Sequence, residues 1–247
     1  MNPEPTEPVA PAAEGSTNAF QRLGGVLVAP TETLRSIVGR PTWLVALVLI
    51  TLLSVVGSFL VAPKLDLESG MRDQFEERGG MSEEQIDQAI KVATTIQKFS
   101  GLIAAFTTPI TLLVISGLFL LIFKVFGGDG GFSQFFAVTI HAWLPQTIKG
   151  ILVTALIFFR DTVTVEELPA LLKSNLGFLS DPKDSPMAFA LLSSIDVFTF
   201  WTLFLLIVGF AFASRMKQST AAIMVIVPWL VVVLFKVAMA ALQGGMS

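Results

Sequence analysis

Three ionisable side chains lie inside stretches of sequence that are otherwise strongly apolar: Lys149, Asp196 and Lys236. Charged groups are costly in an apolar interior, where they tend to face a partner or a cavity. A carboxylate level with two ammonium groups could form an ion pair that fixes helix register, or a polar site that attracts an anion. We call these three residues the polar cluster, and at this stage both interpretations stay open.

The stretches around these charges are long enough to cross a bilayer. Hydrophobic residues make up 53% of the chain and charged residues only 14%, whereas a soluble protein carries about a quarter charged residues. A helix needs about 20 apolar residues to cross roughly 30 Å of hydrocarbon. We predict five spans, at residues 42–62, 101–123, 133–159, 188–214 and 219–242.

The third span is the least regular, because Pro145 and Lys149 interrupt it. A four-span protein is the alternative, but neighbouring helices can accommodate a proline inside a bilayer. With five alternating spans, the polar cluster lies 16, 18 and 17 residues from the same edge of spans three, four and five. At about 1.5 Å per residue, all three charges share a depth of roughly 24 to 27 Å.

The predicted fold class is therefore an all-α integral membrane bundle of five transmembrane helices. Residues 1–17, rich in Pro and Glu, are expected to form a disordered tail, and residues 18–247 a single membrane domain. Phe20, Leu23 and Leu27 recur at helical spacing, which predicts an N-terminal interfacial helix with Gln21 and Arg22 between them.

Two long loops, 63–100 and 160–187, are predicted on one face of the membrane. The first contains two helical repeats separated by Gly79 and Gly80, with a capping box at Ser82 and Gln85, and so predicts an extracytoplasmic helical hairpin. Its acidic side chains could cap the bundle or attract a partner. These acidic residues are Glu76, Glu77, Glu83, Glu84 and Asp87.

Lys and Arg are denser beside the opposite ends of the spans, where acidic residues are fewer. The positive-inside rule then places the N-terminus in the cytoplasm and the C-terminus outside it. No basic start precedes an early apolar core, so the first span is expected to act as the targeting signal. We predict a multi-pass protein of the bacterial inner membrane.

Few chemistries fit this composition. The chain has no cysteine and one histidine, which excludes thiolate and multi-histidine metal sites, and no catalytic or phosphate-binding motif occurs. We therefore predict no enzyme activity and no cofactor. The net charge of −3 argues against nucleic acid. His141 beside Trp143 is interpreted as a possible interfacial pair rather than a proton relay.

Several weak motifs together resemble the Yip1-domain family of bacterial membrane proteins. They are residues 29–34 and 40–43, the segment from Gly127 to Pro145, and the segment 194–201. The family's Asp-x-Phe-x-x-Trp element corresponds to Asp196, Phe198 and Trp201. The resemblance implies five spans with a cytoplasmic N-terminus.

Eukaryotic relatives of this family are associated with Rab-type GTPases, through an Asp-Leu-Tyr-Gly-Pro segment. This chain lacks that segment and contains no tyrosine, so a Rab-type partner is not supported. The predicted function is that of a non-enzymatic membrane protein that acts through other membrane proteins, itself or lipid. A transporter, or an accessory subunit of one, that uses the polar cluster is the alternative.

Overall fold

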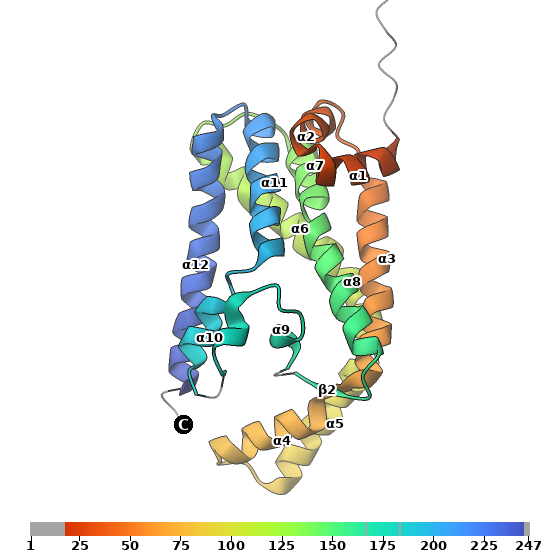
Figure 1. Cartoon of the computed structure of the whole chain (residues 1–247), viewed down its shortest axis with the longest axis vertical. Coiled ribbons are helices and arrows are strands. Elements are labelled where there is room, and N and C mark those ends of the chain that lie inside the picture. The colour runs from red at the N-terminus through yellow and green to blue at the C-terminus, as the bar shows by residue number, and fades with distance from the viewer. Residues whose placement is uncertain (1–17, 166, 183, 245–247) are drawn as a thin grey trace, which may run out of the picture.

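The computed structural model describes residues 18–165, 167–182 and 184–244, and the tail predicted for residues 1–17 lies outside them. This part of the chain is predominantly helical (Figure 1). Five of its helical stretches are long and apolar enough to cross a membrane, which confirms the predicted bundle. They are Leu44–Lys64, Ser100–Val125, Phe132–Phe158, Val197–Ser214 and Gln218–Leu242.

Two short helices, α1 (Ala19–Val28) and α2 (Pro30–Gly39), lie at the N-terminal end of the bundle (Figure 1). A capping box starts α1, since the Asn18 side chain accepts from the Gln21 amide and the Gln21 side chain accepts from the Asn18 amide. Pro30 occupies the first turn of α2, where its missing N–H costs nothing.

The side of α1 that faces the bundle differs from the side that the spacing predicted. Leu23 is buried as expected, but Phe20 is 70% exposed and Arg22 only 7%. The Arg22 guanidinium donates to the Arg40 carbonyl at 2.8 Å and to the Thr42 hydroxyl at 2.6 Å, and these bonds hold it inside. A helix is present at the predicted position, but one of its polar side chains belongs to the interior.

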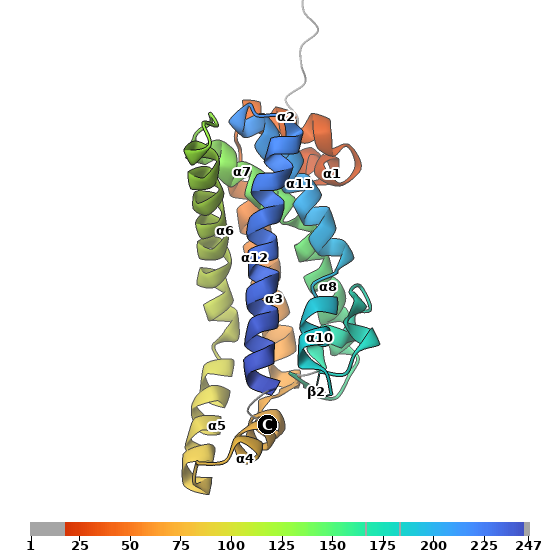
Figure 2. The same ribbon diagram turned by 90° about the vertical axis from the view of Figure 1, so that its left-hand side faces the viewer.

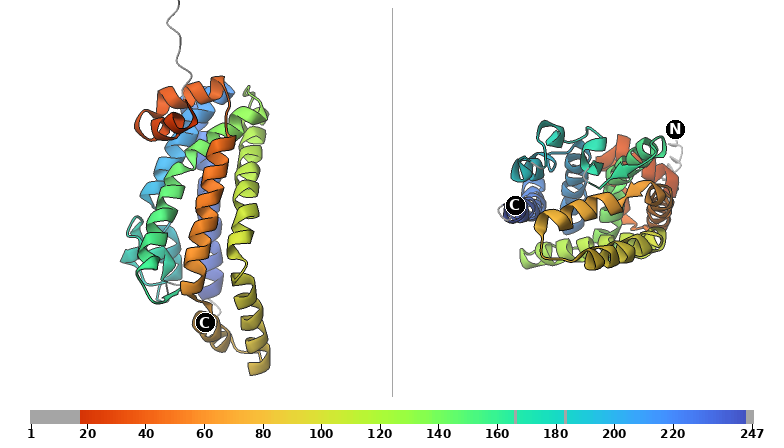
Figure 3. Two further views of the ribbon diagram at one scale, coloured as in Figure 1. Left: turned by 90° about the vertical axis from the view of Figure 1, so that its right-hand side faces the viewer. Right: turned by 90° about the horizontal axis from the view of Figure 1, so that it is seen from below.

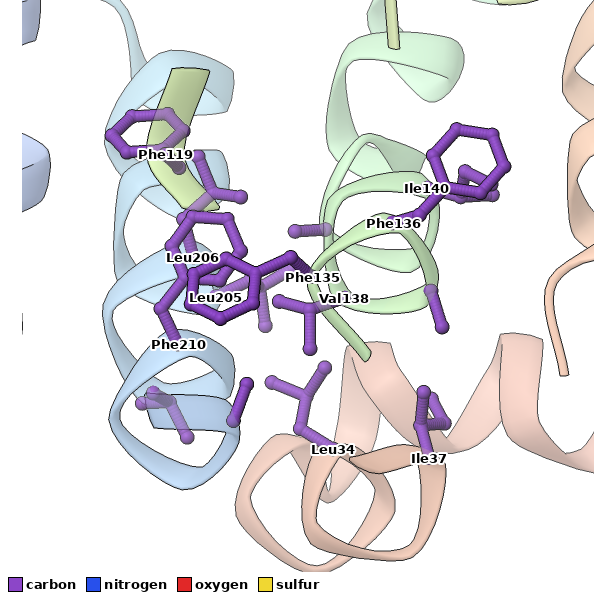
Figure 4. Packing of buried hydrophobic residues seen from close by; sticks show 14 of the residues in the cluster. Leu34, Ile37, Phe119, Phe135, Phe136, Val138, Ile140, Leu205, Leu206 and Phe210 are labelled. Carbon is purple, nitrogen blue, oxygen red and sulfur yellow. The ribbon is translucent and has the colours of Figure 1, made fainter. Parts of the chain in front are cut away.

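The N-terminal end of the bundle has a densely packed aromatic core, formed where α2, α6 (Ser100–Val125), α7 (Phe132–Ala142) and α11 (Val197–Ser214) meet. The Phe135 and Phe210 rings stack with centroids 4.9 Å apart, and Phe119 lies 5.0 Å from Phe210. Leu34 and Ile37 of α2 close this core from the end (Figure 4). Both α1 and α2 are thus packed onto the spans.

Span one is α3 (Leu44–Val61), followed by a 3₁₀ turn, η1 (Ala62–Lys64), and it packs along α6 and α8 (Leu144–Phe158). Span three is divided into α7 and α8 at Trp143. Pro145 has no N–H and so interrupts the helical ladder. The Trp143 amide donates to Thr139 at 3.0 Å and the Thr147 amide to Trp143 at 3.1 Å, which leaves the divided helix continuous as one span.

Span four corrects the prediction of one continuous helix over 188–214. The structure has a short helix α10 (Pro186–Leu192), a non-helical segment at residues 193–196, and then α11. Figure 1 shows α11 starting near the middle of the bundle, with α10 beside the lower half of α12 (Gln218–Gly244). Asp196 has extended dihedral angles, φ −128° and ψ 133°, so it ends the non-helical segment and is the N-cap residue of α11.

The two long loops are joined to each other at the far end of the bundle. A short parallel pair of strands links β1 (Leu65–Asp66) to β2 (Val163–Thr164), and the Lys64 ammonium donates to the Arg160 carbonyl at 2.7 Å. The second loop also contains α9 (Leu168–Leu171) and a 3₁₀ turn, η2 (Leu176–Leu179). These contacts fix where the second loop returns toward span four.

The first loop forms the predicted helical hairpin from α4 (Leu67–Arg78) and α5 (Glu83–Gln97). The hairpin extends beyond the ends of the spans (Figure 2). Seen from below, α4 lies across the ends of the spans (Figure 3, right). The capping box at Ser82 and Gln85 is present. A turn at residues 98–99 separates α5 from α6, the helix of span two.

Ion pairs reduce the acidic field that the sequence predicted for the hairpin. Arg72 lies 2.7 Å from Asp87, 3.4 Å from Glu83 and 3.7 Å from Glu68. The hydrogen bond to Asp87 raises the pKa of Arg72 further above its usual value. At the start of α4, the Ser69 backbone amide lowers the pKa of Asp66 by donating to its carboxylate. Asp66, Glu68, Glu83 and Asp87 thus interact within the hairpin itself.

Gly209 marks the closest approach of α11 to α7. A Cβ at this position would lie 2.4 Å from one methyl group of Val138, and the β-branched Val138 has little freedom to move away. On α6, Gly117 has open space where a Cβ would be. The two glycines therefore form a matched pair for testing this contact.

We expect Gly209→Ala to destabilise the detergent-solubilised protein by about 1–3 kcal/mol, the usual cost of overpacking a core. Gly117→Ala should be neutral or stabilising, because alanine is the better helix former. Thermal unfolding followed by tryptophan fluorescence measures both. Equal unfolding midpoints for the two variants would show that α7 and α11 do not pack as described.

Candidate functional site

Asp196 is the centre of the polar cluster, and its side chain is almost completely buried. One carboxylate oxygen accepts from the Lys149 ammonium at 2.9 Å and from the Ser174 hydroxyl at 2.6 Å. The other accepts from the Thr199 backbone amide at 3.0 Å, the bond that defines an N-cap. The carboxylate therefore joins three segments: α8, the second loop and α11.

The second loop pairs with the break in span four through its backbone. The Leu176 amide donates to the Ile195 carbonyl at 3.2 Å, and the Val197 amide donates to the Ser174 carbonyl at 3.0 Å. Asn175, 5% exposed, accepts from the Gly177 amide at 2.8 Å and donates to the Pro169 carbonyl at 3.0 Å. Backbone groups freed by the break thus find partners within the protein, as a low-dielectric environment requires.

Lys149 is the accessible member of the ion pair. Its side chain is 29% exposed, against 2% for Asp196. It lies on a groove of about 600 Å³ between α3 and α8, together with Trp143 and Gln146. Small residues such as Gly57 and Gly150 line the same groove and leave room there. Lys149 is therefore the one residue of the pair that a ligand in this groove could reach.

Lys236 lies beside the pair but is not bonded to it. Its ammonium donates to the Ser193 hydroxyl at 2.8 Å and to the Ser194 hydroxyl at 3.4 Å, so it stabilises the same break from α12. All three charged side chains thus meet at residues 193–196, the break in span four. Among the three charges, Lys149 and Asp196 form an ion pair, and Lys236 binds the adjacent serines.

His141 packs inside the protein and is only 2% exposed. Its Nδ1 is 2.8 Å from the Ala137 carbonyl of the preceding turn. Trp143 marks the junction of α7 and α8 and is partly buried against the core. Both residues belong to span three, and neither contacts Asp196 through a hydrogen bond that the structure describes.

The other two family-motif positions lie on the first turns of α11. The Phe198 carbonyl accepts from the Thr202 hydroxyl at 2.9 Å, and Trp201 packs against the core. Ser174, Asn175 and Thr199 were missed by the sequence interpretation. A signal for Thr199 existed, since Asp196 precedes it by three residues and follows two serines, a pattern that favours an N-cap. Nothing in the sequence indicated which loop residue would pair with the break.

Five membrane-spanning helices around a buried ion pair define a multi-pass α-helical membrane protein. The model of the Yip1 domain family matches residues 24–239, from α1 into the last turns of α12. The chain belongs to the Yip1 family. No curated protein and no solved structure matches it.

The ion pair and the cap can be separated by substitution. Asp196→Asn removes the charge but keeps a side chain that caps a helix well, whereas Asp196→Ala removes both. Leaving Lys149 without its partner should destabilise the protein by about 3–5 kcal/mol, and losing the cap by about 1 kcal/mol more. The unfolding midpoint in detergent is expected to fall in the order wild type, Asp196→Asn, Asp196→Ala.

A double-mutant cycle tests whether the pair acts as a unit. The double variant Lys149→Met/Asp196→Asn should lose less stability than the sum of the losses in the two single variants. The reason is that the double variant lacks both charges of the pair, so neither is left without a partner. Lys236→Met with Asp196→Asn serves as the matched comparison and should be closer to additive. Additivity in both cycles would rule out the Lys149–Asp196 pair as a stabilising contact.

Proposed function

We propose that this Yip1-family protein is non-enzymatic and acts through contacts with other membrane proteins or with lipid. The proposal rests on the hydrogen-bond partners of the buried Asp196 carboxylate. Asp196 accepts from Lys149, Ser174 and Thr199, so its lone pairs are directed to structural partners rather than to a substrate. A group held in this way is better suited to fixing an architecture than to moving protons.

An exposed apolar surface on the hairpin supports a protein partner. We define the α5 groove, of about 510 Å³, by its lining residues Met81, Gln85, Gln88, Ala89, Val92, Ala93 and Ile96. Val92 and Ile96 are 53% and 54% exposed, while Ile86 and Ile90 on the other side of α5 are buried. A helix with a second apolar face outside the spans fits a partner helix or loop.

The proposed location is a bacterial inner membrane, with the N-terminus cytoplasmic and the α5 groove extracytoplasmic. Support for this orientation comes from the positive-inside rule, because Arg35, Arg40 and Lys124 lie at the end of the bundle that carries α1 and α2. The partner would then meet the hairpin outside the cytoplasm. We infer no Rab-type GTPase as that partner.

A transporter, or an accessory subunit of one, remains the second candidate. One observation favours it: span four is broken inside the bundle, and Lys149 beside that break lines the groove between α3 and α8. Broken helices with charged groups near the membrane midplane form substrate sites in known transporters. In this interpretation Lys149 and Lys236 would attract an anion.

A photo-crosslinking amino acid at Val92 tests the partner hypothesis in intact membranes. We expect one reproducible crosslinked species from Val92 and none from Lys91, which is the neighbouring exposed position outside the groove. Val92→Asp should abolish co-purification of the same species, because a charge in an apolar contact is strongly unfavourable. Lys91→Asp is the control for charge alone and should retain it.

Purified protein in liposomes separates the two candidates. Under the proposed function, anion flux through the wild type should equal that through protein-free liposomes. Flux that Lys149→Met and Lys236→Met both abolish, with no crosslink at Val92, would replace the partner hypothesis by transport.

A further inference from the structure

A third pocket lies at the N-terminal end of the bundle, the end opposite the hairpin. It has a volume of about 510 Å³ and is bounded by α1, the α2–α3 junction and α7. Arg22, Arg40, Thr42, Trp43 and His141 line it, and among the described residues no acidic side chain lines it. We call it the arginine pocket. Two arginines beside one space, with no carboxylate among the described lining residues, favour an anion.

Arg22 is the unusual member of this pocket. It is 93% buried, yet its Nε has no hydrogen-bond partner within the described residues. Its Nη1 donates to the Arg40 carbonyl and the Thr42 hydroxyl, which are uncharged acceptors. A buried arginine almost always has a counter-ion, because an unpaired charge in a low-dielectric site is very costly. The described residues supply none to Arg22 through a salt bridge.

The position of the pocket indicates where its anion comes from. Leu44 and Val45, at the start of the first span, line it and are 61% and 44% exposed, so its mouth adjoins the surface that faces hydrocarbon. Trp43 lies at the same level, as tryptophans do where a span meets the headgroup layer. Phospholipid phosphates occupy that layer, and an acyl chain can leave the pocket along Leu44 and Val45.

We propose that the arginine pocket binds the phosphodiester of one anionic phospholipid. The phosphate accepts from the Arg22 and Arg40 guanidiniums and the Thr42 hydroxyl, and the acyl chains lie against α3. An anionic headgroup fits better than a zwitterionic one, since the latter would bring a cation to two arginines. The proposal deepens the lipid branch of the proposed function and does not depend on the hairpin partner, so either can fail alone.

Native mass spectrometry of the full-length protein, purified in neutral detergent with added phosphatidylglycerol, tests the site. We expect one retained phosphatidylglycerol in the wild type and at least tenfold weaker retention in Arg22→Gln and Arg40→Gln. Arg35→Gln is the matched control. Arg35 lies at the same end but outside the pocket, where its guanidinium stacks on Phe212 at 4.9 Å, so retention should be unchanged.

Arg40→Gln distinguishes loss of the lipid site from loss of the fold. It leaves the Arg22 bonds in place, because only the Arg40 backbone accepts from Arg22. Phosphatidylglycerol should raise the unfolding midpoint of the wild type and Arg35→Gln, but not of the two pocket variants. Equal retention in all proteins, or an equal loss in all three variants, would overturn the proposal. The same stabilisation by inorganic phosphate alone would assign the pocket to a soluble anion and overturn the lipid source.

Discussion

The architecture of this protein depends on satisfying the backbone where span four is interrupted. Lipid offers no hydrogen-bond partner to a broken helix, so the interruption requires groups from the protein itself. Asp196 supplies the cap of α11, and the second loop supplies Ser174 and the backbone around Asn175. Lys149 then neutralises the carboxylate from α8. Without this set of contacts, several polar groups at the break would lack hydrogen-bond partners in the bilayer.

The two ends of the bundle are consequently held by different forces. At the N-terminal end, the aromatic rings of α6, α7 and α11 and the apolar face of α2 form a dry core. Toward the hairpin, α10 packs against α12, the Lys236 ammonium of α12 donates to the Ser193 hydroxyl, and a small strand pair joins the two long loops. Dispersion and close packing hold the first region, and hydrogen bonds and an ion pair add to packing in the second. The arginine pocket lies in the first region and the Lys149 groove faces the second.

The sequence predicts the spans well, because apolar length is a local property that needs no tertiary information. The same argument failed at residues 188–196, where an apolar run is shared by a short helix, a break and the start of another helix. Periodicity cannot detect that break, since the partners of Asp196 are 22 residues upstream and 47 residues upstream. Arg22 was misplaced for a related reason: its acceptors are contributed by the α2–α3 junction, not by its own helix.

The family element Asp-x-Phe-x-x-Trp acquires a structural meaning from this break. Asp196 is the cap, and Phe198 and Trp201, three residues apart, share one side of the first turns of α11. The carboxylate is held both by the positive end of that helix and by Lys149. Those two interactions favour its charged form and its fixed position together. Any ligand reaching this region from the groove would therefore meet Lys149, whose side chain is partly exposed, before it could reach Asp196.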